Sequence, residues 1–226
     1  MIHAFGTCNV LSCSTENPDR DINSWVKYAA DIIGLDYANY GQKSVDNNYI
    51  YHKVISNLDL FEKDDIILVG WADVSSRLFS SDNVSAEVLN DSLTYPGLGT
   101  DLWIRSKGKK DGKWDGNFNY RESFGNDYYD TYFQNYYNEH IAQLELLQKV
   151  SSLHSILNDY NIKHIFTADK KLSMDIVKNV NWFYPSGLGI VEFTKHVGAI
   201  SKTNCHLSNK GHEIVGELFV GYYSEL

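Results

Sequence analysis

The chain has 226 residues, 43% of them hydrophobic and 22% charged, with a formal net charge of −9 and a pI near 5.3. This is the composition of an ordinary globular protein, and the length suits one domain over residues 1–226 that can bury a full core. The acidic balance argues against a protein that binds the phosphate backbone of nucleic acid. No apolar stretch approaches the roughly 20 residues of a membrane-spanning helix. We therefore expect neither a nucleic-acid nor a membrane partner.

Three cysteines at irregular spacing indicate neither a disulfide framework nor a CxxC-type metal site. We expect no metal and no cofactor, although Cys205, beside His206, leaves a disulfide with Cys8 or a shared metal open as alternatives. No charged segment precedes a long apolar run near the N-terminus, so the sequence predicts no signal peptide and a protein that folds in a reducing compartment such as the cytoplasm.

The first half of the chain alternates between predicted strands and helices. Short apolar segments predict strands over residues 1–10, 35–41 and 64–71. The third has consecutive apolar residues after two Asp, which is typical of a strand buried on both faces of a parallel sheet. Amphipathic patterns predict helices over 22–34 and 45–60.

Residues 75–135 have a different character. They are rich in Tyr, Gly and Asn and show little helical periodicity, so we interpret them as a long insertion in the domain. Its aromatic residues suit either a sugar-binding platform or an interface for self-association or assembly, and both alternatives stay open. The Lys-rich run 107–113, which glycines and Asp111 interrupt, is expected to be a solvated loop.

The second half continues the alternation. A helical stripe of Ile141, Leu144, Leu147, Val150 and Leu157 predicts a long helix that ends near Tyr160. A strand is predicted over 163–169, and a last helix is capped by Ser208, with His212 on its surface or against a neighbouring loop. The fold class is therefore α/β, an open parallel sheet with helices on both faces.

Reactive residue types fall where the predicted strands end. In such folds the active site lies at the carboxyl ends of the strands. That edge collects the thiol of Cys8, the hydroxyl of Ser44 and the carboxylate of Asp73, and His206 lies at the start of the last helix. A histidine there can act as a general base for a cysteine nucleophile.

The four segments resemble the four blocks of the SGNH/GDSL hydrolase superfamily in order and spacing. They are Gly6-Thr7-Cys8, Asn39 to Ser44, Gly70-Trp71-Ala72-Asp73 and Thr203-Asn204-Cys205-His206. The resemblance implies a flavodoxin-like three-layer sandwich, and an esterase, lipase or carbohydrate O-acetyl esterase activity. Segments near residues 25–41 and 207–219 also resemble versions of this fold from tailed bacteriophages, which implies a virion-associated protein as the alternative to a cytoplasmic one.

The resemblance assigns Cys8 as the nucleophile and His206 as the base, and it implies oxyanion or substrate contacts from Gly41, Ser44, Trp71, Ala72 and Asp73. Several positions depart from the family pattern. Cys8 stands for Ser, Thr7 for Asp, Ala72 for Asn, and Thr203 or Asn204 for the Asp that orients the base. Two functions follow: a hydrolase of acyl esters that acts on an acylated small molecule or polysaccharide, or an inactive module that binds glycans or builds an assembly.

Overall fold

The computed structural model describes residues 1–7, 24–41, 45–74, 138–172, 179–199 and 207–226, together with four short strands between residues 77 and 114.

The centre of the molecule is a sheet of four parallel strands in the order β2-β1-β3-β8. The strands are β1 (Ile2–Gly6), β2 (Tyr37–Asn39), β3 (Ile66–Trp71) and β8 (Lys163–Ala168). With β8 counted as the fourth strand, this is the flavodoxin-like order. The chain places β2 on one side of β1 and the later strands on the other side, so the direction in which strands are added reverses between β1 and β3. The predicted α/β fold with a parallel sheet is confirmed.

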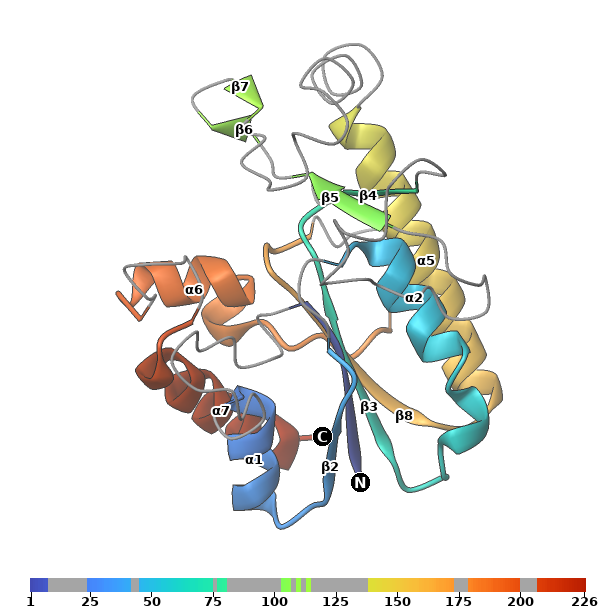
Figure 1. The fold of residues 1–226 in the computed structure, drawn as a ribbon. Helices are drawn as coiled ribbons and strands as arrows, with labels where there is room; N and C mark the ends of the chain where they lie inside the picture. Colours follow the sequence, from blue (N-terminus) through green and yellow to red (C-terminus); the bar gives the residue numbers. More distant parts are fainter. Residues whose placement is uncertain are drawn as a thin grey trace, which may run out of the picture.

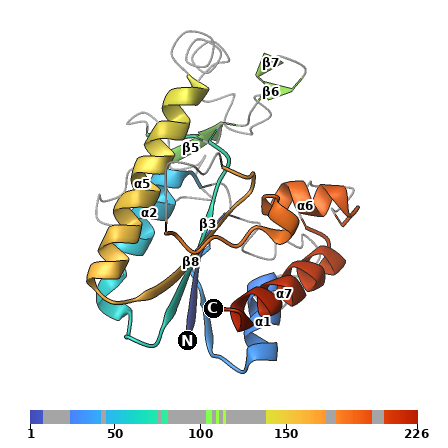
Figure 2. The same ribbon diagram turned by 180° about the vertical axis from the view of Figure 1, so that it is seen from behind.

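Helices cover both faces of the sheet, which gives three layers (Figures 1 and 2). One face carries α1 (Trp25–Ile33), α6 (Ile190–His196) and α7 (Asn209–Ser224), and the other carries α2 (Asn47–Ile55) and α5 (Glu139–Asp159). Among the described residues, no helix combines the length and the apolar composition needed to cross a bilayer.

The buried side chains of the strands alternate between the two faces. In β3, Ile66 and Leu68 belong to the core beneath α1 and α7, whereas Ile67 and Val69 belong to the core beneath α2 and α5. All six residues of β3 are buried, as the uninterrupted apolar run predicts.

Four helices begin at side-chain caps. Ser24, Asp46, Asn138 and Ser208 accept hydrogen bonds from the backbone N–H groups of Lys27, Tyr49, Ile141 and Gly211, over 3.1, 2.9, 3.1 and 3.1 Å. These bonds satisfy donors that the first turn of a helix leaves without a partner. The predicted cap at Ser208 is confirmed.

Other details of the sequence analysis are wrong. The side chains of Ile141 and Leu144, which the helical stripe places in the core, are 53% and 46% exposed. The reason is that Ile141 and Leu144 lie on the outer side of α5 (Figure 1), away from the face of Ala142, Leu146, Val150 and Leu153, which is buried in the core. The stripe is right for Leu147, Val150 and Leu157, which are buried. His212 was expected at the helix surface or against a neighbouring loop. The first alternative is wrong, because His212 is buried, and its Nδ1 accepts a 3.1 Å hydrogen bond from the backbone N–H of Trp25 at the start of α1.

Two short antiparallel strand pairs lie in the predicted insertion. β4 (Arg77–Ser80) pairs with β5 (Trp103–Ser106), and β6 (Lys109–Lys110) pairs with β7 (Lys113–Trp114). The Lys-rich run expected to be a loop thus carries a small hairpin. The aromatic side chains of the insertion lie outside the described residues, so its role stays a prediction. The helix α6 and the short 3₁₀ turn Pro185–Gly187 were not predicted.

Candidate functional site

The described residues include only part of the predicted site. Thr7, Gly41, Trp71, Ala72 and Asp73 are described. The residues predicted to carry the chemistry lie outside the described residues, and so do their supporting positions: Cys8, Ser44, Thr203, Asn204, Cys205 and His206.

The carboxyl ends of β1 and β3 are neighbours. In the register of the sheet Gly6 pairs with Gly70, and Gly70 pairs with Thr167 of β8. Adjacent strands lie about 4.8 Å apart, so Thr7 and the Ala72-Asp73 segment leave the sheet side by side. The structure therefore brings together the described parts of the first and third predicted segments.

The described part of the second segment, Asn39 to Gly41, flanks β1 on its other side. The N–H of Tyr40 donates to the carbonyl of Ala4 over 2.7 Å. The N–H of Gly41 donates to Oδ1 of Asn39 over 2.9 Å, which closes a tight turn at the strand end. This N–H group is therefore engaged within the protein.

A buried amide holds the third segment in place. Asn47, the first residue of α2, donates from Nδ2 to the carbonyl of Ala72 over 3.0 Å and accepts at Oδ1 from the N–H of Ala72 over 2.8 Å. Both backbone groups of Ala72 are thus paired with one side chain. The sequence analysis missed Asn47, because an Asn at the start of a helix reads as a capping residue and gives no sign of a partner 25 residues away.

The ring of Trp71 belongs to the core. It has no exposed surface and packs edge-on against Phe166, with ring centroids 5.9 Å apart. Trp71 therefore supports the end of β3 from below, on the face that α2 and α5 cover.

Asp73 forms an ion pair with Lys170, which follows β8. Burial acts to lower the pKa of Lys170. The hydrogen bond and charge of Asp73, with the carboxylates of Glu139 and Glu192, outweigh burial and hold the pKa of Lys170 above its usual value. Lys170 is therefore a cation, and its surroundings are on balance acidic. Because the Lys170 side chain is 59% exposed, the pair contributes little to stability.

The segment after β8 is held by α6. The Asp169 N–H donates to the carbonyl of Trp71 over 3.0 Å, which joins the ends of β8 and β3. An oxygen of Glu192 accepts hydrogen bonds from the N–H groups of Lys171 and Gly189, over 2.8 and 3.0 Å. A Cβ on Gly189 would lie only 2.5 Å from the Lys170 backbone, so the close approach requires glycine. None of these contacts was predicted, because α6 itself was missed.

A recess of about 280 Å³ opens between these segments. Its described lining comes from the end of β3, the first turns of α5 and the segment after β8: Ala72, Asp73, Val74, Glu139, His140, Gln143, Leu144, Leu147, Lys170, Lys171 and Leu172. Apart from Asp73 and Ala72, no lining residue was predicted to belong to a site. The predicted helical stripe placed Leu144 in the core, whereas the buried stripe of α5 runs through Ala142, Leu146 and Val150.

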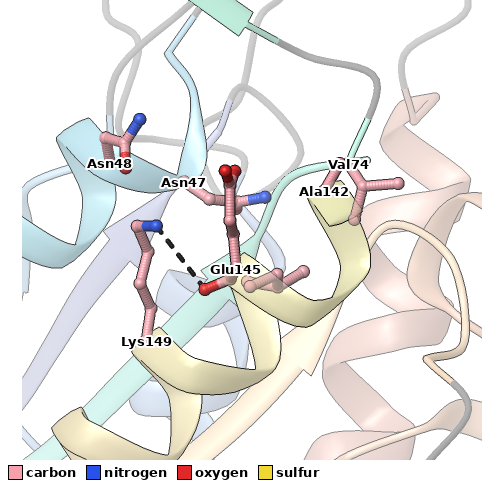
Figure 3. Close-up of a pocket in the computed structure, with 7 residues that line it drawn as sticks. Asn47, Asn48, Val74, Ala142, Glu145 and Lys149 are labelled. Atoms are coloured by element: carbon pink, nitrogen blue, oxygen red, sulfur yellow. Dashed lines mark hydrogen bonds between the residues drawn. The ribbon is translucent and has the colours of Figure 1, made fainter. Parts of the chain in front are cut away.

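A second pocket, between α2 and α5, is much smaller. It has a volume of about 10 Å³, near the lower limit for one water molecule. Figure 3 shows its lining, in which Nζ of Lys149 lies 3.5 Å from the carbonyl oxygen of Glu145, to which it donates. Asn47 and Val74 belong to this lining too, so the small pocket lies directly behind the segment that Asn47 holds. It is too small for a substrate. Within the described residues no group of three or more His, Cys, Asp or Glu side chains could hold a metal ion.

No family model and no curated protein matches this sequence. Solved structures do resemble its fold. A lipolytic protein of the G-D-S-L family from Desulfitobacterium hafniense DCB-2 has a TM-score of 0.51 and 11% identity, with 98% of each chain covered. A member of the same family from Veillonella parvula DSM 2008 has a TM-score of 0.52 and 9% identity, over 100% of this chain and 98% of that one. The lipase Lip_vut3 from a goat rumen metagenome has a TM-score of 0.52 and 8% identity, over 98% and 96% of the two chains.

These likenesses span nearly the whole of both chains. At identities of 8 to 11% they show the fold alone, which is that of the SGNH/GDSL hydrolases. The fold expected from the four sequence segments is therefore confirmed.

Proposed function

We propose that this protein hydrolyses acyl esters, with Cys8 as the nucleophile and His206 as the general base. The pairing of Gly6 with Gly70 at the carboxyl edge of an SGNH-like sheet supports this proposal most strongly. Cys8 follows Gly6 by two residues, at the edge where parallel sheets of this kind bind their ligands. The similar solved structures described as lipolytic proteins and as a lipase add support to ester chemistry.

The reaction has two stages. His206 takes the proton of the Cys8 thiol, and the thiolate attacks the ester carbonyl carbon. The tetrahedral oxyanion collapses, the bond to the alcohol oxygen breaks, and His206 returns the proton to the leaving alcohol. A water that His206 deprotonates then attacks the thioester, releases the acid and regenerates the thiol. The substrate is an acylated small molecule or an acylated polysaccharide.

Backbone N–H groups hold the oxyanion in this proposal. The N–H groups of Gly41 and Ala72 already have acceptors within the protein. We therefore assign the oxyanion contacts to the N–H of Cys8 and to the end of the 41–44 turn at Ser44. Each such donor is worth about 10²–10³ in rate.

The test is turnover of p-nitrophenyl acetate, together with labelling by iodoacetamide. We expect Cys8→Ala to lower kcat/KM at least about 10³-fold, because it removes the covalent step, and we expect Cys8 to label faster than a free thiol. Cys13→Ala is the matched control and should retain turnover. Turnover that survives Cys8→Ala would show that the nucleophile is another residue.

The second candidate is an inactive module of the same fold that binds glycans or takes part in an assembly. The engaged N–H groups of Gly41 and Ala72 favour it, because they cannot serve as oxyanion donors without losing their present partners. It predicts no turnover and a Cys8 that labels no faster than a free thiol. It also predicts glycan binding or self-association through the 75–135 segment, measured by a glycan array and by sedimentation at several concentrations.

A further inference from the structure

The recess beside Asp73 has the chemistry of a site for an aliphatic chain. We infer that it binds a hydrocarbon chain of about ten carbons as one part of the ester, an inference that rests on the proposed hydrolase function for its role in catalysis. The substrates would then be esters with a medium-length apolar group, rather than simple acetates of a small alcohol.

The inner surface of the recess is apolar. Its lining includes three buried apolar residues, Ala72, Val74 and Leu147, and two apolar residues that are more exposed, Leu144 and Leu172. Leu144 is 46% exposed although it is a large apolar residue. A ligand that covered it would remove apolar surface from water, which is favourable at about 25 cal/mol per Å².

The outer margin of the recess is polar. Glu139, His140, Gln143 and Lys171 are exposed residues around the opening, and the Asp73–Lys170 ion pair lies on one side. Lys170 is already compensated by Asp73 and by two further carboxylates, Glu139 and Glu192. The exposed Lys171 and Glu139 add one charge of each sign, so the charges of the described lining balance and favour neither an anionic nor a cationic ligand. An apolar base within a polar margin suits a chain whose far end is buried and whose ester group stays outside.

The volume sets the size of the chain. A dry cavity of about 150 Å³ holds benzene, which has six carbons. The recess of about 280 Å³ therefore holds roughly ten carbons, and an acetyl group would leave most of it empty.

The position of the recess connects it to the proposed chemistry. Ala72 follows Gly70 by two residues, just past the end of β3, and Cys8 follows Gly6 by two residues in the sequence; the two glycines are paired. An ester whose chain occupies the recess thus reaches the carboxyl edge where we propose the nucleophile.

Two substrate series test the inference and tell which side of the ester carries the chain. The first is p-nitrophenyl esters with acyl chains of two to twelve carbons, and the second is n-alkyl acetates with alcohols of the same lengths. In one series we expect kcat/KM to rise up to about fourfold per added CH₂ and to level off near ten carbons. A chain-length dependence that is flat or falling in both series would overturn the inference.

A pair of variants on α5 locates the effect. Leu144→Trp fills the recess and should shift the preferred chain to two to four carbons. Ile141→Trp, at a residue that is 53% exposed and does not belong to the described lining, should leave the preference unchanged. Equal shifts in both variants, or none in either, would count against the recess as the site.

A binding measurement separates this inference from the proposed function. Calorimetric titration of the Cys8→Ala protein with 1-octanol should show binding that Leu144→Trp weakens at least tenfold and Ile141→Trp leaves intact. Such binding without hydrolysis of any ester would refute the hydrolase and retain the chain site. Hydrolysis of short esters without octanol binding would refute the chain site and retain the hydrolase.

Discussion

One amide side chain fixes the segment that follows β3. Asn47 pairs with both the N–H and the carbonyl of Ala72, and it is itself buried. A buried polar group that loses its partner costs about 1–3 kcal/mol. Asn47 therefore affects the position of Asp73, and of the recess, without reaching a ligand.

We expect Asn47→Ala to lower the free energy of unfolding by about 2–4 kcal/mol, because it leaves two backbone groups of Ala72 without partners. The matched control is Asn48→Ala at the next residue, whose amide makes a single 3.3 Å bond to Asp46 and is only partly buried. That change should cost less than about 1 kcal/mol. Urea unfolding of the two variants measures both values, and equal losses would contradict the role given to Asn47.

At the scale of elements, the α1–α7 pair depends on close packing. A Cβ on Gly216 of α7 would lie 2.7 Å from the Tyr28 ring and 2.9 Å from the carbonyl of Trp25. The ring of Phe219 then packs edge-on against Trp25 with centroids 5.4 Å apart. His212 adds its bond to the N-terminus of α1. Both helices are thereby held against one face of the sheet, and α7 begins three residues after His206 in the sequence.

Gly216→Ala is expected to destabilise the protein by about 1–3 kcal/mol, because the added methyl forces α1 and α7 apart. Gly221→Ala, on the same helix, meets nothing within 4 Å and should stabilise it by up to about 1 kcal/mol through helix propensity. Thermal or urea unfolding distinguishes the two variants, because the change in the free energy of unfolding has opposite signs. A Gly216→Ala protein as stable as Gly221→Ala would show that the helices do not pack this closely.

At the scale of the whole molecule, stability should depend on pH through a pair of histidines. Nδ1 of His164 donates to the carbonyl of Ile162, so its Nε2 accepts from Nδ1 of His154 over 2.7 Å. Burial lowers the pKa of His164, aided by the charge of His154, and burial also lowers the pKa of His154. Both side chains are therefore neutral in the folded protein at neutral pH.

The sign of the pH effect follows from these shifts. As pH falls, these two histidines become protonated near pH 6.5 in the unfolded chain, and only at lower pH in the folded protein. The free energy of unfolding should therefore fall as pH drops below about 6.5. Their contribution to stability is fully lost below the pKa values that they have in the folded protein. Urea unfolding from pH 8 to pH 5 measures it.

His164→Phe should flatten this pH dependence. His140→Asn, which removes an exposed histidine of α5, should preserve it. Some slope will remain in His164→Phe, because burial and the nearby charge of Lys149 also lower the pKa of His52. An unchanged slope in His164→Phe would contradict the assignment.

A further loss of folding stability, caused by protonation of Asp65, is expected in stronger acid. Burial acts to raise the pKa of Asp65, but the N–H of Glu62, the N-terminal ammonium and His3 outweigh burial and hold it below its usual value. The contribution of Asp65 is therefore present above pH 3.8 and is lost as pH falls through its folded pKa.

The sequence by itself determined the parts of this protein that depend on local chemistry. The cap at Ser208, the fully buried strand β3, and the order of the four central strands and of the helices other than α6 follow from short-range hydrogen bonding and from apolar runs. That order, with the four segments, was enough to identify the SGNH-like fold.

Only the tertiary structure decided which surfaces meet. It paired Asn47 with Ala72, brought His212 to the backbone N–H of Trp25 and formed the recess between the end of β3, α5 and the segment after β8. No pattern along the chain could give these results, because each depends on residues that are distant in sequence. The physical reason is that periodicity reports which face of a helix is apolar, whereas burial requires another element to lie against that face.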